Sequence, residues 1–233
     1  MKNYLVIGAS SGIGKELVAL LLRDGHRVYG TYRNTQVLSN EEGVSYHFLD
    51  VIQEPLNTDF LPESLDGLVY CPGAINLRPF ARLKTENFIG DFQVQVLGAV
   101  KLIQAALPFL RKSGSASIVL FSTVAVKTGF NFHSLVSTSK GAVEGLSRAL
   151  AAEFSPGIRV NCIAPSITDT PLASGLLNTD AKRKANAERH PLKRIGSAND
   201  IAEMAAFLLS EKSQWITGQV VGVDGGISSI KTI

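Results

Sequence analysis

Residues 4–14 read Tyr-Leu-Val-Ile-Gly-Ala-Ser-Ser-Gly-Ile-Gly, and this stretch decides the fold. Its first four residues form a short apolar run, which is typical of a buried parallel strand. Glycines follow at the spacing G-x-x-x-G-x-G, and residues 15–23 then carry leucines at helical spacing until Gly25 ends the pattern. Glycine lets a backbone turn tightly and approach a pyrophosphate, while a helix N-terminus offers free amide donors and the positive end of its dipole. An ordinary glycine-rich turn is the alternative, but the strand before the loop and the helix after it favour nucleotide binding.

Outward from this loop, strand and helix patterns alternate along almost the whole chain. Such alternation builds a parallel sheet with helices on both faces, joined by right-handed crossovers. We therefore predict an α/β fold with a doubly wound parallel sheet (Rossmann fold), as a single domain over residues 1–233. Ligands in such sheets bind beyond the carboxyl ends of the strands. The further strands are expected at 27–32, 45–49, 68–70, 117–121, 159–163 and 219–223, and the further helices at 86–110, 135–154 and 201–209.

The segment 166–195 breaks this rhythm, because it contains no expected strand. A long excursion after a strand end is more often a lid or substrate loop than a linker, so we expect a lid-like segment here. Its residues Leu172, Leu176 and Leu177 indicate a partly apolar ligand.

Composition fits a protein with a large packed core. Of 233 residues, 45% are hydrophobic and 18% are charged, and the formal net charge is +3. The basic cluster 182–184 is offset by Asp180 and Glu188, which favours a solvated helix face over a nucleic-acid surface. We expect no membrane span, since no apolar run reaches roughly 18 residues. The N-terminal residues lack the three regions of a signal peptide, so none is expected.

The two cysteines, Cys71 and Cys162, lie far apart in apolar runs. Buried thiols are the favoured interpretation, with a disulfide or a metal site as the alternatives. We therefore expect no metal site and a reducing, cytoplasmic location.

The second strand ends in Tyr32-Arg33-Asn34, which bears on the cofactor. A carboxylate at such a strand end binds the ribose 2′-hydroxyl of NAD, whereas an arginine suits the 2′-phosphate of NADP. No acidic residue lies between Val28 and Ser39. The sequence thus favours NADP over NAD, and the alternative for Arg33 is an ordinary surface arginine.

Further motifs follow the glycine loop along nearly the whole chain. They are Asp50-Val51, Ile-Val-Leu-Phe-Ser-Thr at 118–123, Ser-Lys-Gly-Ala-Val at 139–143, Arg-Val-Asn-Cys-Ile-Ala-Pro at 159–165, Thr-Pro-Leu at 170–172, Ile-Thr-Gly-Gln at 216–219 and Val-Asp-Gly-Gly at 223–226. With these motifs the chain resembles the classical short-chain dehydrogenase/reductases, especially the β-ketoacyl carrier-protein reductase-like group.

The resemblance implies a role for each matching residue and an assembly. Asp50 and Val51 would hold adenine, Lys140 the nicotinamide ribose, and Gly73 is retained from a cofactor-binding motif. Relatives pair through the two long helices, so a homotetramer or homodimer is implied. Residues 165–170, including Pro165, Ile167 and Thr170, would pack on the nicotinamide. The pyrophosphate and adenosine ribose would be held by Gly8, Ser10, Ser11, Gly12, Ile13 and Gly14.

The departures from the family pattern concern catalysis. The family's catalytic asparagine, serine, tyrosine and lysine fall on Gln95, Thr123, Val136 and Lys140. Valine neither donates nor accepts a proton, so the family's usual acid is missing. Losing a positioned acid typically costs about 10²–10⁴ in rate.

Several groups remain as candidates for the missing chemistry. Lys140 can stabilise a developing oxyanion, directly or through water, and Thr123 can donate a hydrogen bond. His133 enters the same helix and is the best replacement acid, because histidine titrates near pH 6.5; a surface-loop histidine is its alternative. Ser137 is either another donor or ordinary polar filler.

Two functions follow from these residues. The first is an NADP-dependent oxidoreductase with an atypical active site, acting on a small carbonyl or alcohol. The second is a catalytically weak or inactive dinucleotide-binding or regulatory protein on the same fold.

Overall fold

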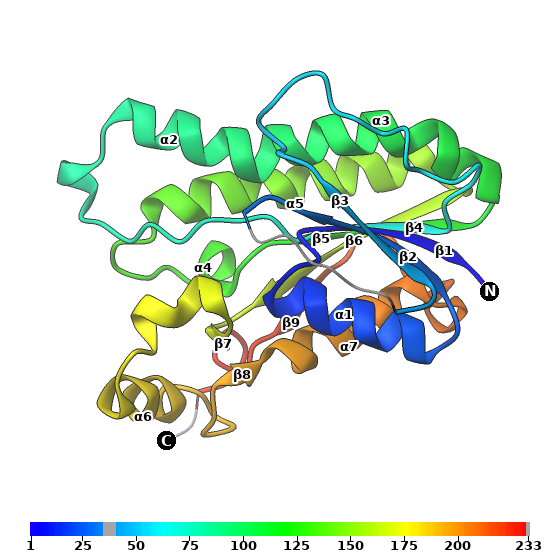
Figure 1. Cartoon of the computed structure of the whole chain (residues 1–233). Helices are drawn as coiled ribbons and strands as arrows, with labels where there is room; N and C mark the ends of the chain where they lie inside the picture. The colour runs from blue at the N-terminus through cyan, green and yellow to red at the C-terminus, as the bar shows by residue number, and fades with distance from the viewer. Residues whose placement is uncertain (35–40, 232–233) are drawn as a thin grey trace.

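The structure, a computed structural model, describes residues 1–34 and 41–231 of the chain. Within them, seven parallel strands form one sheet in the order β3-β2-β1-β4-β5-β6-β9 (Figure 1). The order reverses direction between β1 and β4, which confirms the predicted doubly wound sheet and places a ligand crevice at that point. The strands are β1 (Asn3–Ile7), β2 (Arg27–Tyr32), β3 (Val44–Phe48), β4 (Gly67–Tyr70), β5 (Ala116–Phe121), β6 (Ile158–Pro165) and β9 (Val220–Val223).

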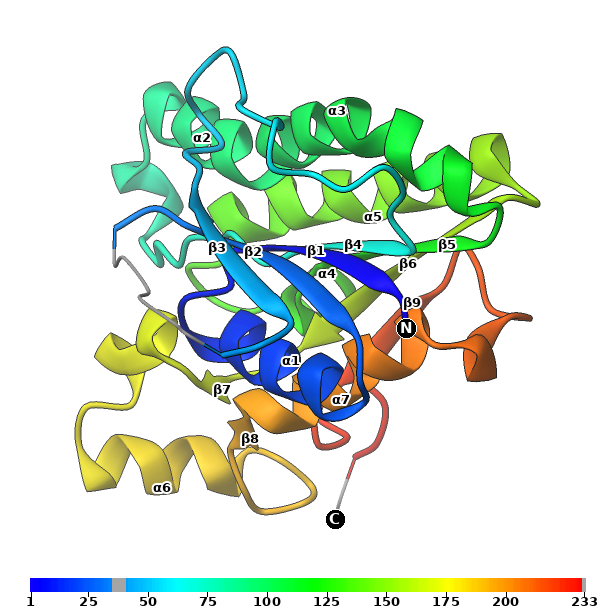
Figure 2. The same cartoon turned by 45° about the vertical axis from the view of Figure 1, so that its right-hand side comes forward.

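Helices cover both faces of this sheet. Figure 1 shows α2, α3 and α5 above it and α1 and α7 below it, and Figure 2 keeps this layering from a second direction. Every residue of the central strands β4 and β5 is buried, because each face of these strands meets a helical layer. The helices are α1 (Gly12–Arg23), α2 (Thr85–Phe92), α3 (Gly98–Ser113), α4 (Val124–Lys127), α5 (Ser134–Phe154), α6 (Asp180–Glu188) and α7 (Ala198–Leu209), with short 3-10 turns η1 (Phe80–Arg82), η3 (Pro171–Leu176) and η4 (Glu211–Ser213).

The long helix predicted over 86–110 lies within one continuous helical stretch, Thr85–Ser113, but its winding is not uniform. The structure divides it into α2, a π-helical turn η2 (Gln93–Leu97) and α3. The Tyr70 hydroxyl, from the end of β4, donates a hydrogen bond to the Val94 carbonyl inside this turn. A backbone carbonyl held by a distant side chain is a local disturbance of the helical ladder, which an amphipathic pattern does not reveal.

The continuous helical stretch Thr85–Ser113 has the length and the mean hydropathy, 1.3 in its most apolar window, of a membrane-spanning helix. However, 44% of that window is buried inside the protein, and core helices pass the same test. Leu102, Ile103 and Leu110 of α3 belong to the core between the sheet and its upper helical layer. The absence of a membrane span stays a prediction.

The segment 166–195 extends beyond the carboxyl ends of the strands (Figures 1 and 2). The expectation that it holds no strand is wrong, because β7 (Thr168–Asp169) pairs in parallel with β8 (Gly196–Ser197) just after the segment. The remainder contains η3 and α6. A strand of two residues carries no alternation that sequence periodicity can detect.

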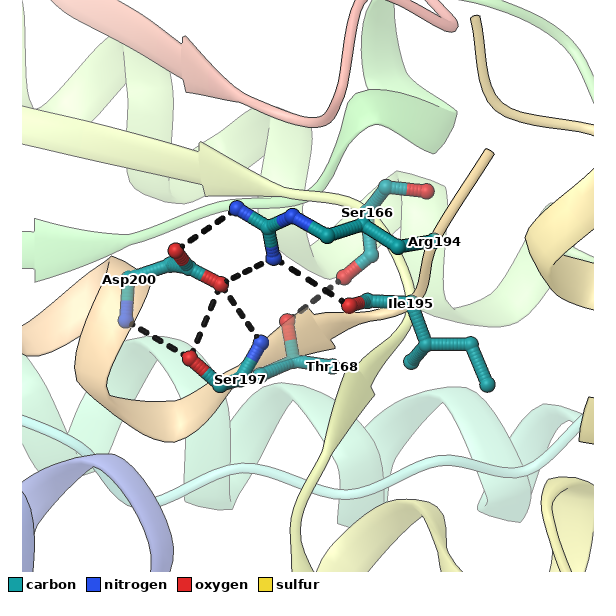
Figure 3. Close-up of polar contacts among 6 residues, drawn as sticks. All are labelled: Ser166, Thr168, Arg194, Ile195, Ser197 and Asp200. Carbon is teal, nitrogen blue, oxygen red and sulfur yellow. Dashed lines mark hydrogen bonds and ion pairs between the residues drawn. The ribbon is translucent and has the colours of Figure 1, made fainter. Parts of the chain in front are cut away.

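The end of this segment is tied to the start of α7 by a compact polar cluster (Figure 3). Arg194 donates to both oxygens of Asp200, at 2.6 and 2.8 Å, and also to the Ile195 carbonyl at 3.3 Å. The Ser197 hydroxyl accepts from the Asp200 backbone, and the Asp200 carboxylate accepts from the Ser197 backbone at 2.7 Å, which forms a capping box. The hydrogen bond from Arg194 holds the pKa of Asp200 well below its ordinary value.

Candidate active site

Two adjoining cavities open at the carboxyl ends of the strands. The first measures about 360 Å³ and is lined by the glycine loop together with Arg33, Leu49 and Val51. The second measures about 500 Å³ and lies between β5, α5 and the segment 166–195. Residues that line both cavities include Ile13, Gly73 and Thr170, so one extended ligand can occupy the two together.

The glycine loop is built for close approach of a ligand to the backbone. A β-carbon at Gly14 would overlap the Gly8 carbonyl oxygen, so only glycine fits there. Gly8 and Gly12 have φ angles of +79° and +53°, which side chains rarely adopt. Ser11 precedes α1 and makes no side-chain cap, so that hydroxyl does not occupy the amide donors of the first turn. These features fit a dinucleotide pyrophosphate.

The residues predicted around the adenosine are only partly brought together. Arg33 is exposed and lines the first cavity, with its Nε donating to Asn34 Oδ1 at 3.0 Å. Val51 lines it as well, whereas Asp50 does not; the Asp50 carboxylate accepts from the Ile52 backbone at 3.0 Å. Residues 35–40, which include part of the stretch without acidic residues, lie outside the described residues.

The side chains of Gln95 and Lys140 both reach Gly73 in the second cavity. A β-carbon at Gly73 would lie 3.6 Å from Gln95 Oε1 and 3.7 Å from Lys140 Nζ. Gln95 Nε2 donates to Asp91 at 2.7 Å, and in the described part of the chain its buried Oε1 has no partner. Lys140 is 8% exposed, and burial lowers the pKa of its ammonium to about 8. The site thus holds an unpaired acceptor next to a buried cation, which fits a bound hydroxyl-bearing ligand.

Thr123 and Val136 also line the second cavity. Thr123 Oγ1 accepts from the Ala125 backbone at 3.3 Å, which caps α4 and leaves the hydroxyl proton available to a ligand. Val136 lies one turn before Lys140 and is 7% exposed. Ser137 donates its proton to the Ala125 carbonyl at 3.0 Å, so its hydroxyl joins α5 to α4 instead of acting as a free donor.

His133 lies at the start of α5 and lines the same cavity. Its Nδ1 is 2.7 Å from the Asn131 carbonyl oxygen. Because a carbonyl only accepts, Nδ1 carries a hydrogen atom and Nε2 is the nitrogen left for other partners. Pro165, Ile167 and Thr170 line the second cavity as well, so the residues predicted for the nicotinamide lie beside the predicted catalytic residues.

Comparisons with known proteins agree with this geometry. The sequence model of a family described as enoyl-(acyl carrier protein) reductase matches residues 8–228. A tropinone reductase homologue of Arabidopsis thaliana is 35% identical and covers 97% of this chain and 92% of its own length. A short-chain dehydrogenase/reductase from Mycobacterium ulcerans superposes with a TM-score of 0.86 at 27% identity, covering 97% of this chain and 90% of its own. The chain belongs to the short-chain dehydrogenase/reductase family.

Membership makes the protein a short-chain dehydrogenase/reductase oxidoreductase with a dinucleotide cofactor, as the resemblance implied. A protein named ElxO, solved with NADP bound, is similar at a TM-score of 0.88 and 29% identity, covering 99% of this chain and all of its own. The finer likeness to the β-ketoacyl carrier-protein reductase-like group stays a prediction.

Sequence reasoning about this short-chain dehydrogenase/reductase missed a buried histidine. His190 is 3% exposed and lines the second cavity. Its Nδ1 is 2.7 Å from the Asn186 carbonyl oxygen, and its Nε2 lies 2.8 Å from the Ser166 hydroxyl. It also missed the buried hydrogen bond from Ser122 to Glu144, at 2.7 Å, which joins the end of β5 to α5. No motif marks these residues, since each depends on segments that meet only in the fold.

The helix α6 brings Lys182, Asn186 and Arg189 to the second cavity, with Arg189 as its C-terminal cap. The signal for these residues was present, since a spacing of four and then three residues puts side chains on one helix face. Within residues 1–34 and 41–231, no group of three or more His, Cys, Asp or Glu side chains is arranged to hold a metal ion. Cys71 and Cys162 are free thiols.

Proposed function

We propose that this protein is an NADP-dependent oxidoreductase that interconverts a small carbonyl compound and its alcohol, using a proton donor other than residue 136. The observation that carries the proposal is the convergence of Gln95 and Lys140 beside Gly73, next to the glycine loop. In this proposal the residues for cofactor binding are retained. The usual acid is replaced, because Val136 occupies the place of the family's tyrosine.

NADP is supported by Arg33 and by the similar ElxO structure with NADP bound. A guanidinium offers a two-pronged donor to a 2′-phosphate, which NADH lacks. Titration calorimetry should show tighter binding of NADPH than of NADH, and Arg33→Ala should narrow the difference. Arg27→Ala is the matched control, since Arg27 begins the strand β2 and Arg33 follows the end of that strand. Equal affinities in the wild-type protein would contradict this choice of cofactor.

Each of three residues around the second cavity has its own role in the proposed reaction. When bound, the nicotinamide exchanges hydride with the carbonyl carbon. Thr123 donates its free hydroxyl proton as a hydrogen bond to the carbonyl oxygen, and the ammonium of Lys140 stabilises negative charge that develops there, directly or through water. His133 supplies the proton from Nε2, while the Asn131 carbonyl keeps Nδ1 protonated and fixes the ring.

The direct test follows NADPH absorbance while the native protein is offered a broad panel of carbonyl compounds. Turnover that depends on Thr123 and Lys140 supports the oxidoreductase. A second function remains open because Val136 has no proton to give: a dinucleotide-binding or regulatory protein. NADPH binding by calorimetry without turnover of any carbonyl or alcohol would favour that second function.

A further inference from the structure

The second cavity has a charged lining of one sign. Among its lining residues in the described part of the chain, the charged side chains are Lys140, Lys182 and Arg189, and none is a carboxylate. Lys140 is buried deep beside Gln95, whereas Lys182 and Arg189 are exposed on the far side, at α6. The cavity therefore carries positive charge at two separated places.

The face that α6 turns to this cavity is polar. A helix that covers an apolar space normally presents an apolar stripe to it. In α6, however, no residue is buried, and the cavity-lining positions are Lys182, Asn186 and the cap residue Arg189. Apolar side chains, including Ile167, Leu172 and Leu176, line the same cavity.

The two cations of this face lack carboxylate partners, unlike Arg183 and Lys193 nearby. Lys182 Nζ donates to Asn178 Oδ1 at 2.9 Å and to the Gly175 carbonyl at 3.4 Å, which are neutral acceptors. The guanidinium of Arg189 lies 5.5 Å from the Phe130 ring centre and donates to Asn186 Oδ1 at 3.5 Å. For the described residues, no ion pair within 4.0 Å involves either side chain.

Two basic residues next to them but outside the cavity are neutralised. Arg183 pairs with Asp169 at 2.7 Å, and Lys193 pairs with Glu188 at 3.4 Å. Lys184, which also lies outside the cavity lining, has no ion pair among the described residues, so Lys182 and Arg189 are distinguished from it by their place at the cavity. A cation at the mouth of a low-dielectric cavity attracts anions more strongly than one on an open surface.

We propose that the substrate is an anionic carbonyl or alcohol compound, whose carboxylate or phosphate is bound by Lys182 and Arg189. Its apolar body lies against Ile167, Leu172 and Leu176, and its reacting carbon lies by Lys140. The substrate class rests on the proposed oxidoreductase function, whereas the anion site rests on the cavity alone.

Binding without turnover tests the anion site. The NADP-loaded protein is titrated in a calorimeter with 5-oxohexanoate and 7-oxooctanoate, each beside its methyl ester, and with 5-oxohexyl phosphate. An anion should bind about tenfold or more tightly than its ester, and added salt should reduce this preference. Lys182→Gln and Arg189→Gln should each remove most of the preference. Lys184→Gln removes the same charge from α6 outside the cavity lining and should leave it unchanged.

Each outcome decides between the two proposals. Equal binding of acids and esters, no binding by any anion, or an equal loss in Lys184→Gln would overturn the anion site. Tighter binding of the phosphate supports it and selects phosphate over carboxylate. Binding that depends on Lys182, with no oxidation of NADPH by the oxo acids, keeps the anion site and rejects the oxidoreductase. A fourth outcome is turnover of neutral ketones that Lys182→Gln does not affect, without tighter binding of the corresponding acids. That outcome keeps the oxidoreductase and rejects the anion site.

Discussion

Burial lowers the pKa of Lys140 from its ordinary 10.5 to about 8, because the ammonium loses its water. The unfolded chain thus keeps this proton to a higher pH than the folded chain. Since the folded state binds fewer protons between pH 8 and 10.5, the lysine reduces stability most below about pH 8, and this cost declines as pH rises through that window.

We therefore expect the wild-type protein, free of cofactor, to gain stability relative to Lys140→Met as pH rises from about 8 towards 10.5. One unit of pKa shift corresponds to about 1.4 kcal/mol, which sets the scale of the change. Burial also raises the pKa of the Cys71 and Cys162 thiols to about 12, but both proteins contain them, so their effect cancels. Urea unfolding at several pH values measures the difference. A difference that does not vary with pH would contradict the role assigned to burial.

His133 is the residue on which the proposed proton transfer depends. If its imidazole is the acid, His133→Gln should lower kcat by about 10²–10⁴. Glutamine retains a hydrogen-bonding side chain without a titratable proton, so it separates acidity from simple polarity. NADPH affinity, measured by calorimetry, should stay the same. An unchanged rate would exclude this histidine and leave Thr123 or water as donor.

At the scale of elements, the π-helical turn η2 places a catalytic candidate. Gln95 lies within this turn, and the Tyr70 hydroxyl bonds to the Val94 carbonyl of the same turn. Tyr70 ends β4, just before Cys71 and Gly73 of the cavity lining. The strand end and the helical turn are thus joined close to Gln95, which makes the Tyr70–Val94 hydrogen bond a means of positioning the Gln95 amide.

Gly98 makes room for that contact. A β-carbon at this position would overlap the Tyr70 hydroxyl and lie 3.0 Å from Val51 Cγ2. Gly98→Ala should therefore destabilise the protein by about 1–3 kcal/mol. In the double variant with Tyr70→Phe the loss should be smaller than the sum of the single losses, because the colliding hydroxyl is gone. Urea unfolding measures each free energy.

Gly90→Ala is the matched control, since Gly90 lies in α2 and a β-carbon there meets nothing within 4 Å. Alanine usually stabilises a helix interior relative to glycine by roughly 0.5–1 kcal/mol. Equal destabilisation by both alanine substitutions, or strict additivity with Tyr70→Phe, would show that the Tyr70 contact is not the cause.

Elements whose residues repeat with a clear period were predictable from the sequence. The strand at 27–32 and the helix at 135–154 lie within one residue of β2 and α5, because buried strands and amphipathic helices leave strong local patterns. The π-helical turn inside the helix at 86–110 was not predictable, because it involves the Tyr70 hydroxyl from another element. The strand β7 was not predictable for the same kind of reason, because it is defined by its pairing with another element, β8.

The candidate site was predictable where a motif fixes it. The glycine loop, Lys140 and Thr123 do line the cavities, since their positions follow from strand ends and one helix face. Asp50 lies outside the lining, because its carboxylate closes a local turn instead. His190 and Ser166 meet only after the segment 166–195 folds back, and no spacing in the sequence encodes that contact.

At the scale of the whole molecule, the sheet order and the helical layers place the cavities and the exposed apolar surface on different parts of the protein. The reversal between β1 and β4 opens the cavities at one edge of the sheet, where α6 and its segment lie. The upper helical layer, by contrast, exposes large apolar side chains on the stretch from α2 to η2. These are Ile89, Phe92 and Leu97, which are 54%, 36% and 41% exposed.

We propose that this upper layer pairs two copies of the chain, as the family resemblance implies for the long helices. Ile89 and Leu97 lie about two turns apart, so a second copy would bury them together and exclude water from an apolar face. Sedimentation at micromolar concentration should show a dimer or tetramer, and Ile89→Glu with Leu97→Glu should shift it towards monomer. Leu192→Glu, at an apolar residue that is 65% exposed outside these helices, should not. A wild-type monomer would show that the chain forms no such interface. Dissociation by Leu192→Glu alone would place the interface elsewhere, because only a contact made by the upper layer responds selectively to charge introduced in that layer.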